Sequence, residues 1–368
     1  MKKIILIIAL VVIGLLVWKA NENSPTRVFD GETFKIGIVI GLTDWTAYWG
    51  EDAKRGIDLA VEEINKEGGI NGKKLETIYE DFGPVDLKLA ASGANKLVNV
   101  DNVNVLFSSW LEDTTVVSPI AHKADVPLIS LAAGNKGVSD TEYLFRIRPY
   151  FEGVFPKVSA EYFLKKWNDK PVILYEKLQY YQNYRDEISD TWEKINGYRP
   201  ESFAIVGDAR TILAEAKSKG YNLMYVVAPA PTEIKVMKSA QELGFSVPII
   251  GAGEIDPVLI SAGDLTEGMI LYDYKTSDLV NFTDFYKEKY GLEPGSPSQW
   301  GYDAVYAVYE AVKNRGTSTR DIIEGLKKVN FEGASGIVQF TTDRNRIMDI
   351  DRIRINVKRN GKFIPVTD

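Results

Sequence analysis

The stretch that decides the fold is FKIGIVIGLTDWTAYWGEDAKRGIDLAVEEINKEGG, residues 34–69. Residues 34–42 are a continuous apolar run, which is typical of a strand buried on both faces. Residues 51–67 place their apolar side chains on one helical face, and Gly68-Gly69 is suited to ending the helix. The stretch therefore predicts a buried strand followed by an amphipathic helix.

The same alternation continues along the chain and restarts after Pro149. Two successive runs of this kind predict an α/β fold with two doubly wound parallel-sheet lobes, and a ligand site in the cleft between the carboxyl ends of their strands. Further strands are expected at 74–81, 103–109, 126–132, 171–176, 201–207, 222–230, 247–253, 267–274 and 337–340, with a hairpin over 352–366 that turns at Asn360-Gly361. Further helices are expected at 86–99, 114–124, 153–167, 183–196, 210–219, 232–243, 278–290, 300–314 and 318–329.

Length and composition narrow the class of protein. A chain of 368 residues suggests two domains or one bilobed unit, and 45% apolar with 26% charged residues is ordinary for a globular protein. There is no cysteine and one histidine, His122, which excludes disulfides, thiolate metal sites and cysteine nucleophiles. Apart from residues 1–20, the chain carries 41 basic and 51 acidic residues, so it repels nucleic acid. No cofactor and no metal site is predicted.

The N-terminus has the pattern of an export or anchoring segment. Lys2 and Lys3 precede an apolar run over 4–18, so the rest of the chain is expected outside the cytoplasm, in the periplasm or at the cell surface. A helix of this length spans roughly 22 Å, which fits a signal peptide or a short membrane anchor. Trp18-Lys19-Ala20 is a poor cleavage site, which favours the anchor, with residues 1–20 as the membrane segment and 21–33 as a tether.

Several motifs carry a family resemblance that extends over roughly residues 34–366. The opening stretch contains GLT, YWGED and AVEEINKEGGINGKKL. Later matches, in family order, are ANKLV (94–98), VPLIS (126–130), FRIRP (145–149), PIIG (248–251), EGM (267–269), GYDAVYAVYEAVK (301–313) and FEGASGIVQF (331–340). The chain resembles the type I periplasmic binding proteins, and more narrowly the branched-chain amino acid (Leu/Ile/Val) binding family of ABC transporter solute-binding proteins.

The resemblance implies two lobes joined by three crossover strands, near 146–150, 271–275 and 340–344. Lobe 1 would hold residues 34–147 and 276–340, and lobe 2 would hold 148–275 and 341–368. Ligand binding would close the lobes by a hinge. The expected partners are a small-molecule ligand and the permease and ATPase subunits of an ABC importer, and the body is expected to be a monomer.

The first βα loop, residues 43–50, supplies two candidate ligand residues. Three aromatic side chains within five residues indicate either packing against the lobe or rings that cover a ligand. Tyr48 stands where similar proteins contact ligand, two residues before the loop glycine. Trp45 is the second candidate.

The second βα loop departs from the family. Similar amino-acid binders hold the ligand carboxylate with serines and a threonine there, and Thr114 matches the threonine. Glu112 stands at a serine position, and a carboxylate there repels a carboxylate ligand. Either the loop shifts so that Ser108 and Ser109 hold the ligand carboxylate in place of the missing serines, or the ligand differs. Alternatively, Glu112 and Asp113 only cap the following helix.

Three further candidates come from other loops. Ala133 is retained from the family pattern, whereas a glycine replaces the threonine beside it. Tyr180, followed by a second tyrosine, stands where the family carries a tyrosine over the ligand. Glu254 stands where similar proteins pair the ligand ammonium. An aromatic cleft that also bears acids suits a ligand with a cation or several hydrogen-bond donors.

The leading functional expectation is non-catalytic capture of a small polar ligand, an amino acid or an amide- or amine-like molecule, for an ABC importer. The alternative is a membrane-tethered, ligand-sensing receptor subunit that acts with a partner. An enzyme, such as an amidase or a two-carboxylate glycosidase, is disfavoured because the sequence contains no nucleophile elbow, phosphate loop or metal-spaced cluster.

Overall fold

The computed structural model of the chain describes residues 27, 29, 31–132, 138, 141–149, 158, 162, 170–252, 257–274, 277, 281–347 and 353–366. The apolar run at 4–18 and most of the expected helix at 153–167 lie outside these residues. Among the helices in the described part of the chain, none has both the length and the apolar character that a membrane crossing requires.

Within the described residues the first sheet has six strands in the order β13-β5-β4-β3-β1-β2, and each neighbouring pair is parallel. Every residue of β3 and β5 is buried, as expected for strands covered by helices on both faces. The strands are β1 (Thr33–Ile40), β2 (Lys74–Asp81), β3 (Val105–Ser108), β4 (Leu128–Ser130), β5 (Leu144–Pro149) and β13 (Asn345–Arg346).

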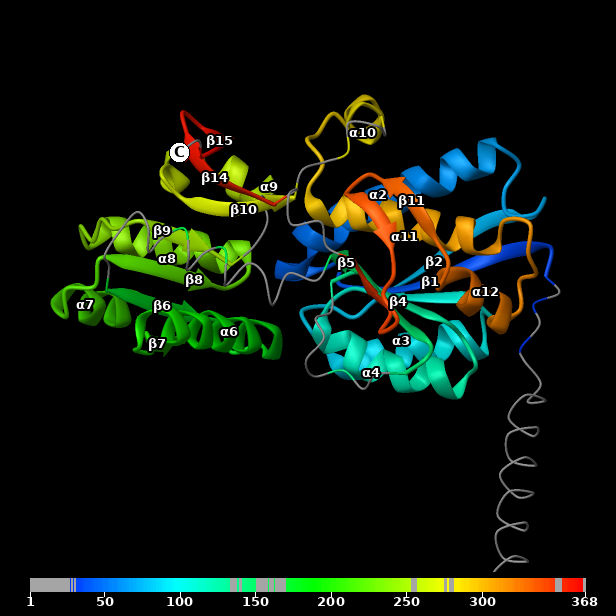
Figure 1. Ribbon diagram of the computed structural model, residues 1–368, viewed down its shortest axis with the longest axis horizontal. Helices are drawn as coiled ribbons and strands as arrows, with labels where there is room; N and C mark the ends of the chain where they lie inside the picture. Colours follow the sequence, from blue (N-terminus) through cyan, green and yellow to red (C-terminus); the bar gives the residue numbers. More distant parts are fainter. Residues whose placement is uncertain are drawn as a thin grey trace, which may run out of the picture.

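Helices cover both faces of this sheet (Figure 1). On one face α2 packs on α11, and a Cβ atom added at Gly56 would lie 1.8 Å from the Ser298 carbonyl oxygen, so their close approach requires glycine there. On the other face α3 packs against α4. The first lobe contains η1 (Asp44–Thr46), α2 (Ala47–Lys66), α3 (Leu87–Asn99), α4 (Leu111–Lys123), α10 (Phe282–Tyr290), α11 (Ser296–Val312), α12 (Thr319–Leu326), and the antiparallel pair β11 (Asn330–Gly333) and β12 (Gly336–Gln339).

In the part of the chain that the structure describes, the second sheet has seven strands in the order β15-β14-β10-β9-β8-β6-β7. Five are parallel, and β14 and β15 add an antiparallel hairpin. Asn360 and Gly361 join this hairpin with φ of 51° and 76°, the left-handed pair of a tight turn, which confirms the predicted turn. The strands are β6 (Pro171–Tyr175), β7 (Glu201–Ala204), β8 (Leu223–Val227), β9 (Ile249–Gly251), β10 (Ile270–Tyr274), β14 (Ile353–Arg359) and β15 (Lys362–Pro365).

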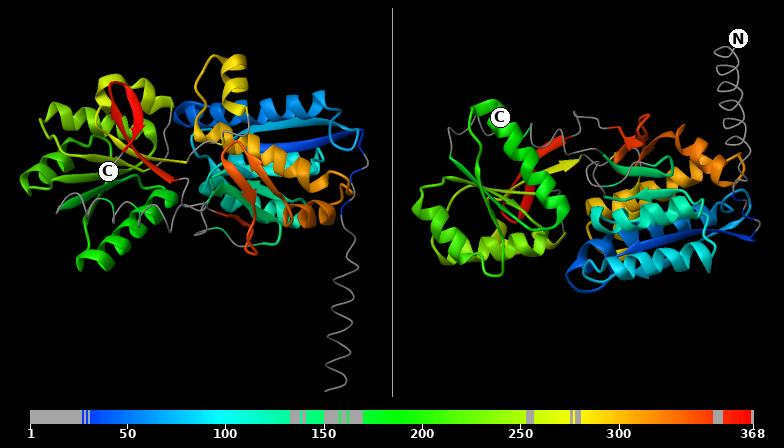
Figure 2. Two further views of the ribbon diagram at one scale, coloured as in Figure 1. Left: turned by 45° about the horizontal axis from the view of Figure 1, so that its top comes forward. Right: turned by 90° about the horizontal axis from the view of Figure 1, so that it is seen from below.

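Alternating side chains of β6 pack on the two faces of this sheet. Ile173 joins a cluster with Trp192 of α6, whereas Val172 joins a cluster with Leu213 of α7 and Val236 of α8. Helix α6 therefore covers one face, and α7 and α8 cover the other (Figure 2). The helices of this lobe are α6 (Gln179–Asn196), α7 (Arg210–Ser218), α8 (Ala230–Glu242), α9 (Pro257–Ser261) and η2 (Gly263–Thr266). The predicted fold class, two helix-covered parallel sheets, is confirmed.

Among the described strands, successive ones change from one sheet to the other three times, after β5, after β10 and after β13. The third passage comes later than expected. The predicted division at residue 340 puts Asn345 and Arg346 in lobe 2, whereas β13 pairs with β5 in the first sheet. Arg346 is held there because its guanidinium is buried against Asp303 of α11.

Candidate functional site

A cavity of about 90 Å³ lies between the two lobes, at the carboxyl ends of β3, β4, β8 and β9. One enclosed water needs about 10–15 Å³, so the cavity has room for several waters or a small ligand. Both lobes supply its walls. The lining residues are Tyr48, Trp49, Trp110, Leu111, Glu112, Ala132, Arg148, Tyr180, Tyr181, Ala228, Pro229, Ala230, Glu233, Ala252, Leu259 and Trp300.

Aromatic rings form much of the lining and support one another. The Trp110 ring centroid lies 5.9 Å from that of Trp49, in an edge-to-face arrangement. It also lies 5.3 Å from that of Trp45. Tyr180 and Tyr181 meet edge to face at 5.1 Å. Of the first-loop candidates, Tyr48 lines the cavity, whereas Trp45 packs against Trp110 and is not among the lining residues.

The hydroxyl groups of the second loop form a buried cluster inside the first lobe. Thr114 Oγ1 lies 2.7 Å from Ser108 Oγ and 3.0 Å from Ser130 Oγ, and none of the three side chains is exposed. Ser109 is also buried, and both its N–H and its hydroxyl donate to Asp113. The structure therefore brings Ser108, Ser109 and Thr114 together, but behind the cavity wall.

Asp113 and Glu112 have different surroundings. Asp113 is fully buried and accepts hydrogen bonds from the backbone N–H groups of Ser109 at 2.7 Å and Trp110 at 2.6 Å, so it caps α4. Burial, opposed by these hydrogen bonds, raises its pKa to about 7. Glu112 instead lines the cavity. Of the two expectations for this pair, capping applies to Asp113 and facing the cleft applies to Glu112.

Glu112 also reaches across the cleft. Its Oε1 accepts a hydrogen bond of 3.3 Å from the backbone N–H of Tyr180, in the first turn of α6. Burial raises the pKa of Glu112, while the backbone N–H groups of Glu112, Tyr180 and Gln179 act in the opposite direction. The carboxylate is thus surrounded by donors from both lobes.

Arg148 is a cationic lining residue that the sequence analysis missed. It lies on β5, and Nη1 donates to the Tyr180 hydroxyl at 2.6 Å. Its guanidinium carbon is 5.3 Å from the ring centroids of both Tyr180 and Trp300, within the range of cation–π attraction. The FRIRP motif contains this residue, but its position near the cavity depends on rings from distant segments.

Glu233 is a second acid that the sequence analysis missed. It lies in the first turn of α8, is 2% exposed, and accepts the Ala252 N–H at 2.7 Å through Oε1. The rule that ligands bind beyond the carboxyl ends of strands could have found it, because it follows β8 closely. Ala133 and Glu254 lie outside the described residues; Ala132, which precedes Ala133, and Ala252, two residues before Glu254, line the cavity.

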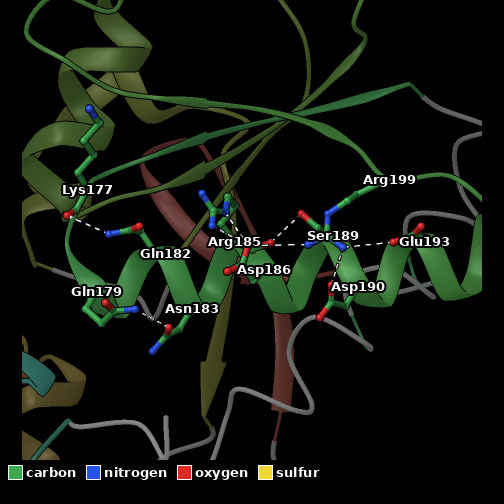
Figure 3. A network of polar contacts seen from close by, with 10 residues as sticks. All are labelled: Lys177, Gln179, Gln182, Asn183, Arg185, Asp186, Ser189, Asp190, Glu193 and Arg199. Atoms are coloured by element: carbon green, nitrogen blue, oxygen red, sulfur yellow. Dashed lines mark hydrogen bonds and ion pairs between the residues drawn. The ribbon is translucent and has the colours of Figure 1, made fainter. Parts of the chain in front are cut away.

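Polar contacts along α6 hold the helix that carries the two tyrosines (Figure 3). Near its start, Gln179 donates to Asn183 at 2.8 Å. Near its end, Arg199 donates to Asp190 at 2.5 Å and to Glu193 at 3.2 Å. These polar contacts lie on the exposed side of the helix, and Trp192 packs its opposite side into the core.

Neither lobe alone could enclose the cavity, because its walls come from both. Two-lobed α/β proteins of this kind form a class that binds a solute in the interlobe cleft and closes around it by a hinge. The chain belongs to the periplasmic binding protein family, whose model matches residues 33–355. The resemblance inferred from the motifs is therefore confirmed. Members of the family are solute-binding proteins that bind small ligands outside the cytoplasm and work with ABC transporter components.

Named relatives agree with this assignment. The chain is 25% identical over 331 residues to Leu/Ile/Val-binding protein homolog 8 of Brucella abortus, covering 81% of this chain and 80% of the relative. It is 26% identical over 357 residues to homolog 7 of Brucella suis, covering 89% and 86% of the two chains.

Solved structures show the same architecture. The branched-chain amino acid transporter substrate binding protein LivJ of Streptococcus pneumoniae, in complex with isoleucine, has a TM-score of 0.80 at 25% identity and covers 90% of this chain and 97% of its own. A solute binding protein of an ABC transporter from Rhodopseudomonas palustris, in complex with 3,4-dihydroxy benzoic acid, has a TM-score of 0.81 at 23% identity and covers 91% and 96%. The second likeness shows the fold alone.

Proposed function

We propose that this protein is the non-catalytic solute-binding component of an ABC importer and captures a small polar ligand, an amino acid or an amide- or amine-like molecule, between its lobes. The observation that carries the proposal is the cavity lined by both lobes, with polar and aromatic residues on its walls. Tyr48, Glu112 and Tyr180 are the predicted ligand residues that line it. Glu254 remains a predicted partner for a ligand ammonium, and Ala133 a predicted backbone contact.

The proposal includes the location and state of the protein. The apolar run at 4–18 would keep it at the membrane, facing outward, and the body would act as a monomer. Intact-mass analysis of the mature protein tests the anchor, because a mass without the first twenty or so residues would mean a cleaved signal peptide instead.

The ligand is identified by purifying the protein natively, releasing bound small molecules by denaturation, and analysing them by mass spectrometry. Calorimetric titration of the refolded, ligand-free protein with each candidate then gives its affinity. X-ray scattering should show the particle becoming more compact on saturation, because closure brings the lobes together. Absence of any released or titratable small molecule across amino acids, amides and amines would argue against solute binding.

A further inference from the structure

Glu112 lies where the N-termini of two helices from different lobes converge. It is the second residue of α4, which begins at Leu111, and the residue is 9% exposed. In the other lobe, α6 begins at Gln179, after Leu178, which offers no side-chain acceptor to cap the helix. The Glu112 carboxylate accepts the Tyr180 N–H of that first turn at 3.3 Å. It therefore caps a helix of the opposite lobe.

Convergence of two helix N-termini creates a position that favours negative charge. Each N-terminus presents backbone N–H groups without an intrahelical partner and the positive end of a helix dipole. An external carboxylate or phosphate commonly occupies such a position. Here an anion of the chain itself is present on the cavity wall, and it bonds to donors that a ligand anion would otherwise use.

The described part of the cavity wall carries one further acid and one base. Glu233 is a second nearly buried acid, and Arg148 is the base whose Nη1 donates to the Tyr180 hydroxyl. When both acids are ionised they outnumber the base, so the lining is then net negative, and charges interact strongly in a site of low dielectric constant. A second carboxylate beside Glu112 would be repelled, whereas aromatic rings attract cations.

We infer that Glu112 is a built-in anion: its carboxylate fills the anion-binding position between α4 and α6, so that the ligand meets this end of the cleft with a neutral or cationic group. The inference rests on the proposed function of the cleft as a solute site. It makes Glu112 a specificity-determining residue that excludes ligands whose carboxylate would have to bind at this position. Through its hydrogen bond with the Tyr180 N–H, Glu112 also connects the two lobes.

Chemical rescue tests the inference without knowledge of the ligand. Glu112→Ala in the full chain, stripped of ligand, vacates the anion position, and acetate is then titrated as the probe. Tryptophan fluorescence reports occupancy, because Trp110 lies beside the position on the cavity wall, and X-ray scattering reports lobe closure. Acetamide, of the same shape without charge, is the probe control. Glu67→Ala, at an exposed acid, is the matched variant control.

Glu112→Ala is expected to be more open than the unmodified protein and to close on adding acetate. Acetate should act at a concentration about tenfold or more below that of acetamide, which corresponds to a charge-assisted hydrogen bond. The unmodified protein, Glu67→Ala and Glu112→Gln, whose amide fills the space, should not respond. If Glu112→Ala does not fold, Glu112→Ser serves in its place.

An equal response to acetate and acetamide, no response, or an equal response of the unmodified protein would overturn the inference. These outcomes are distinct from a failure of solute binding. Acetate rescue reports on the anion position alone, whereas a failure of the proposed function would appear as the absence of any released or titratable small molecule.

Discussion

Arg346 donates a hydrogen bond from Nη1 to Oδ2 of Asp303 over 3.0 Å, and neither side chain is exposed to solvent. The same guanidinium donates to the Ile147 carbonyl of β5 at 3.3 Å and to the Gly336 carbonyl of β12 at 2.9 Å. One arginine thus joins α11, β5, β12 and β13, at the place where two of the three interlobe passages leave the first lobe.

Replacement of Arg346 by methionine is expected to reduce the free energy of unfolding by about 3–5 kcal/mol, because Asp303 would remain as a buried charge without its partner. Urea denaturation measures the change. The double variant Asp303→Asn, Arg346→Met should lose less free energy of unfolding than the sum of the losses in the two single variants, because it contains no buried charge at this position. Additive losses would argue against coupling between the two residues.

Lys358 of β14 supports the second lobe in a similar way. Its ammonium is fully buried and has three N–H donors for four acceptors within hydrogen-bond distance: the carbonyl oxygens of Leu259, Ile260 and Gly263 at 3.0 Å each and Thr266 Oγ1 at 2.6 Å. Lys358→Met should lower the free energy of unfolding by about 3 kcal/mol, because buried acceptors lose their donor. Lys362→Met, at an exposed lysine of the neighbouring strand, should change it little in the same denaturation series.

The regular elements could be predicted from the sequence because strand and helix periods are local signals. The predicted first residues of helices were less accurate than the predicted elements themselves, and α11 shows why. It begins at Ser296, four residues before the expected 300, and its first turn is buried on every side, so no amphipathic contrast marks it. Pro297 in that first turn was the available start signal.

The cavity could be predicted only in part, because a lining residue is defined by contacts between distant segments. Tyr48 and Tyr180 follow strands, so the rule that ligands bind beyond the carboxyl ends of strands could place them near the cavity. Arg148 belongs to the cavity because Tyr180 and Trp300, far apart in sequence, lie against its guanidinium. Thr114 was a family match, but its hydroxyl bonds to Ser108 and Ser130 inside the lobe.

Asp113 should make stability depend on pH. Its pKa is raised from the ordinary 3.8 to about 7 by burial. Between these values the folded protein keeps a proton on Asp113 that the unfolded chain releases, so the contribution of Asp113 to the free energy of unfolding falls as the pH rises from about 4 to about 7. Asp113→Asn should reduce this slope without abolishing it, because burial also raises the pKa of Glu112.

Urea denaturation at a series of pH values measures the slope for Asp113. Asp86→Asn is the control, because Asp86 caps α3 through hydrogen bonds to the Lys88 and Leu89 N–H groups in an exposed position. That variant should retain the slope of the unmodified protein. An unchanged slope in Asp113→Asn would show that the proton is taken up elsewhere.

The Tyr180 hydroxyl should contribute to closure of the lobes. It accepts a hydrogen bond from Arg148 of the first lobe at 2.6 Å, while its backbone N–H donates to Glu112. Tyr180→Phe removes the first contact and keeps the ring and the second contact. A hydrogen bond to a charged group contributes about 1.5–3 kcal/mol, so ligand affinity should fall by about tenfold or more if binding requires the closed form.

Calorimetric titration of Tyr180→Phe with the natively bound ligand gives the affinity, and X-ray scattering of the ligand-free variant should show a more open particle. Tyr198→Phe is the matched control, because Tyr198 is 43% exposed and is not a lining residue. Equal affinity of Tyr180→Phe and the unmodified protein would mean that the Arg148 contact does not help to hold the lobes together.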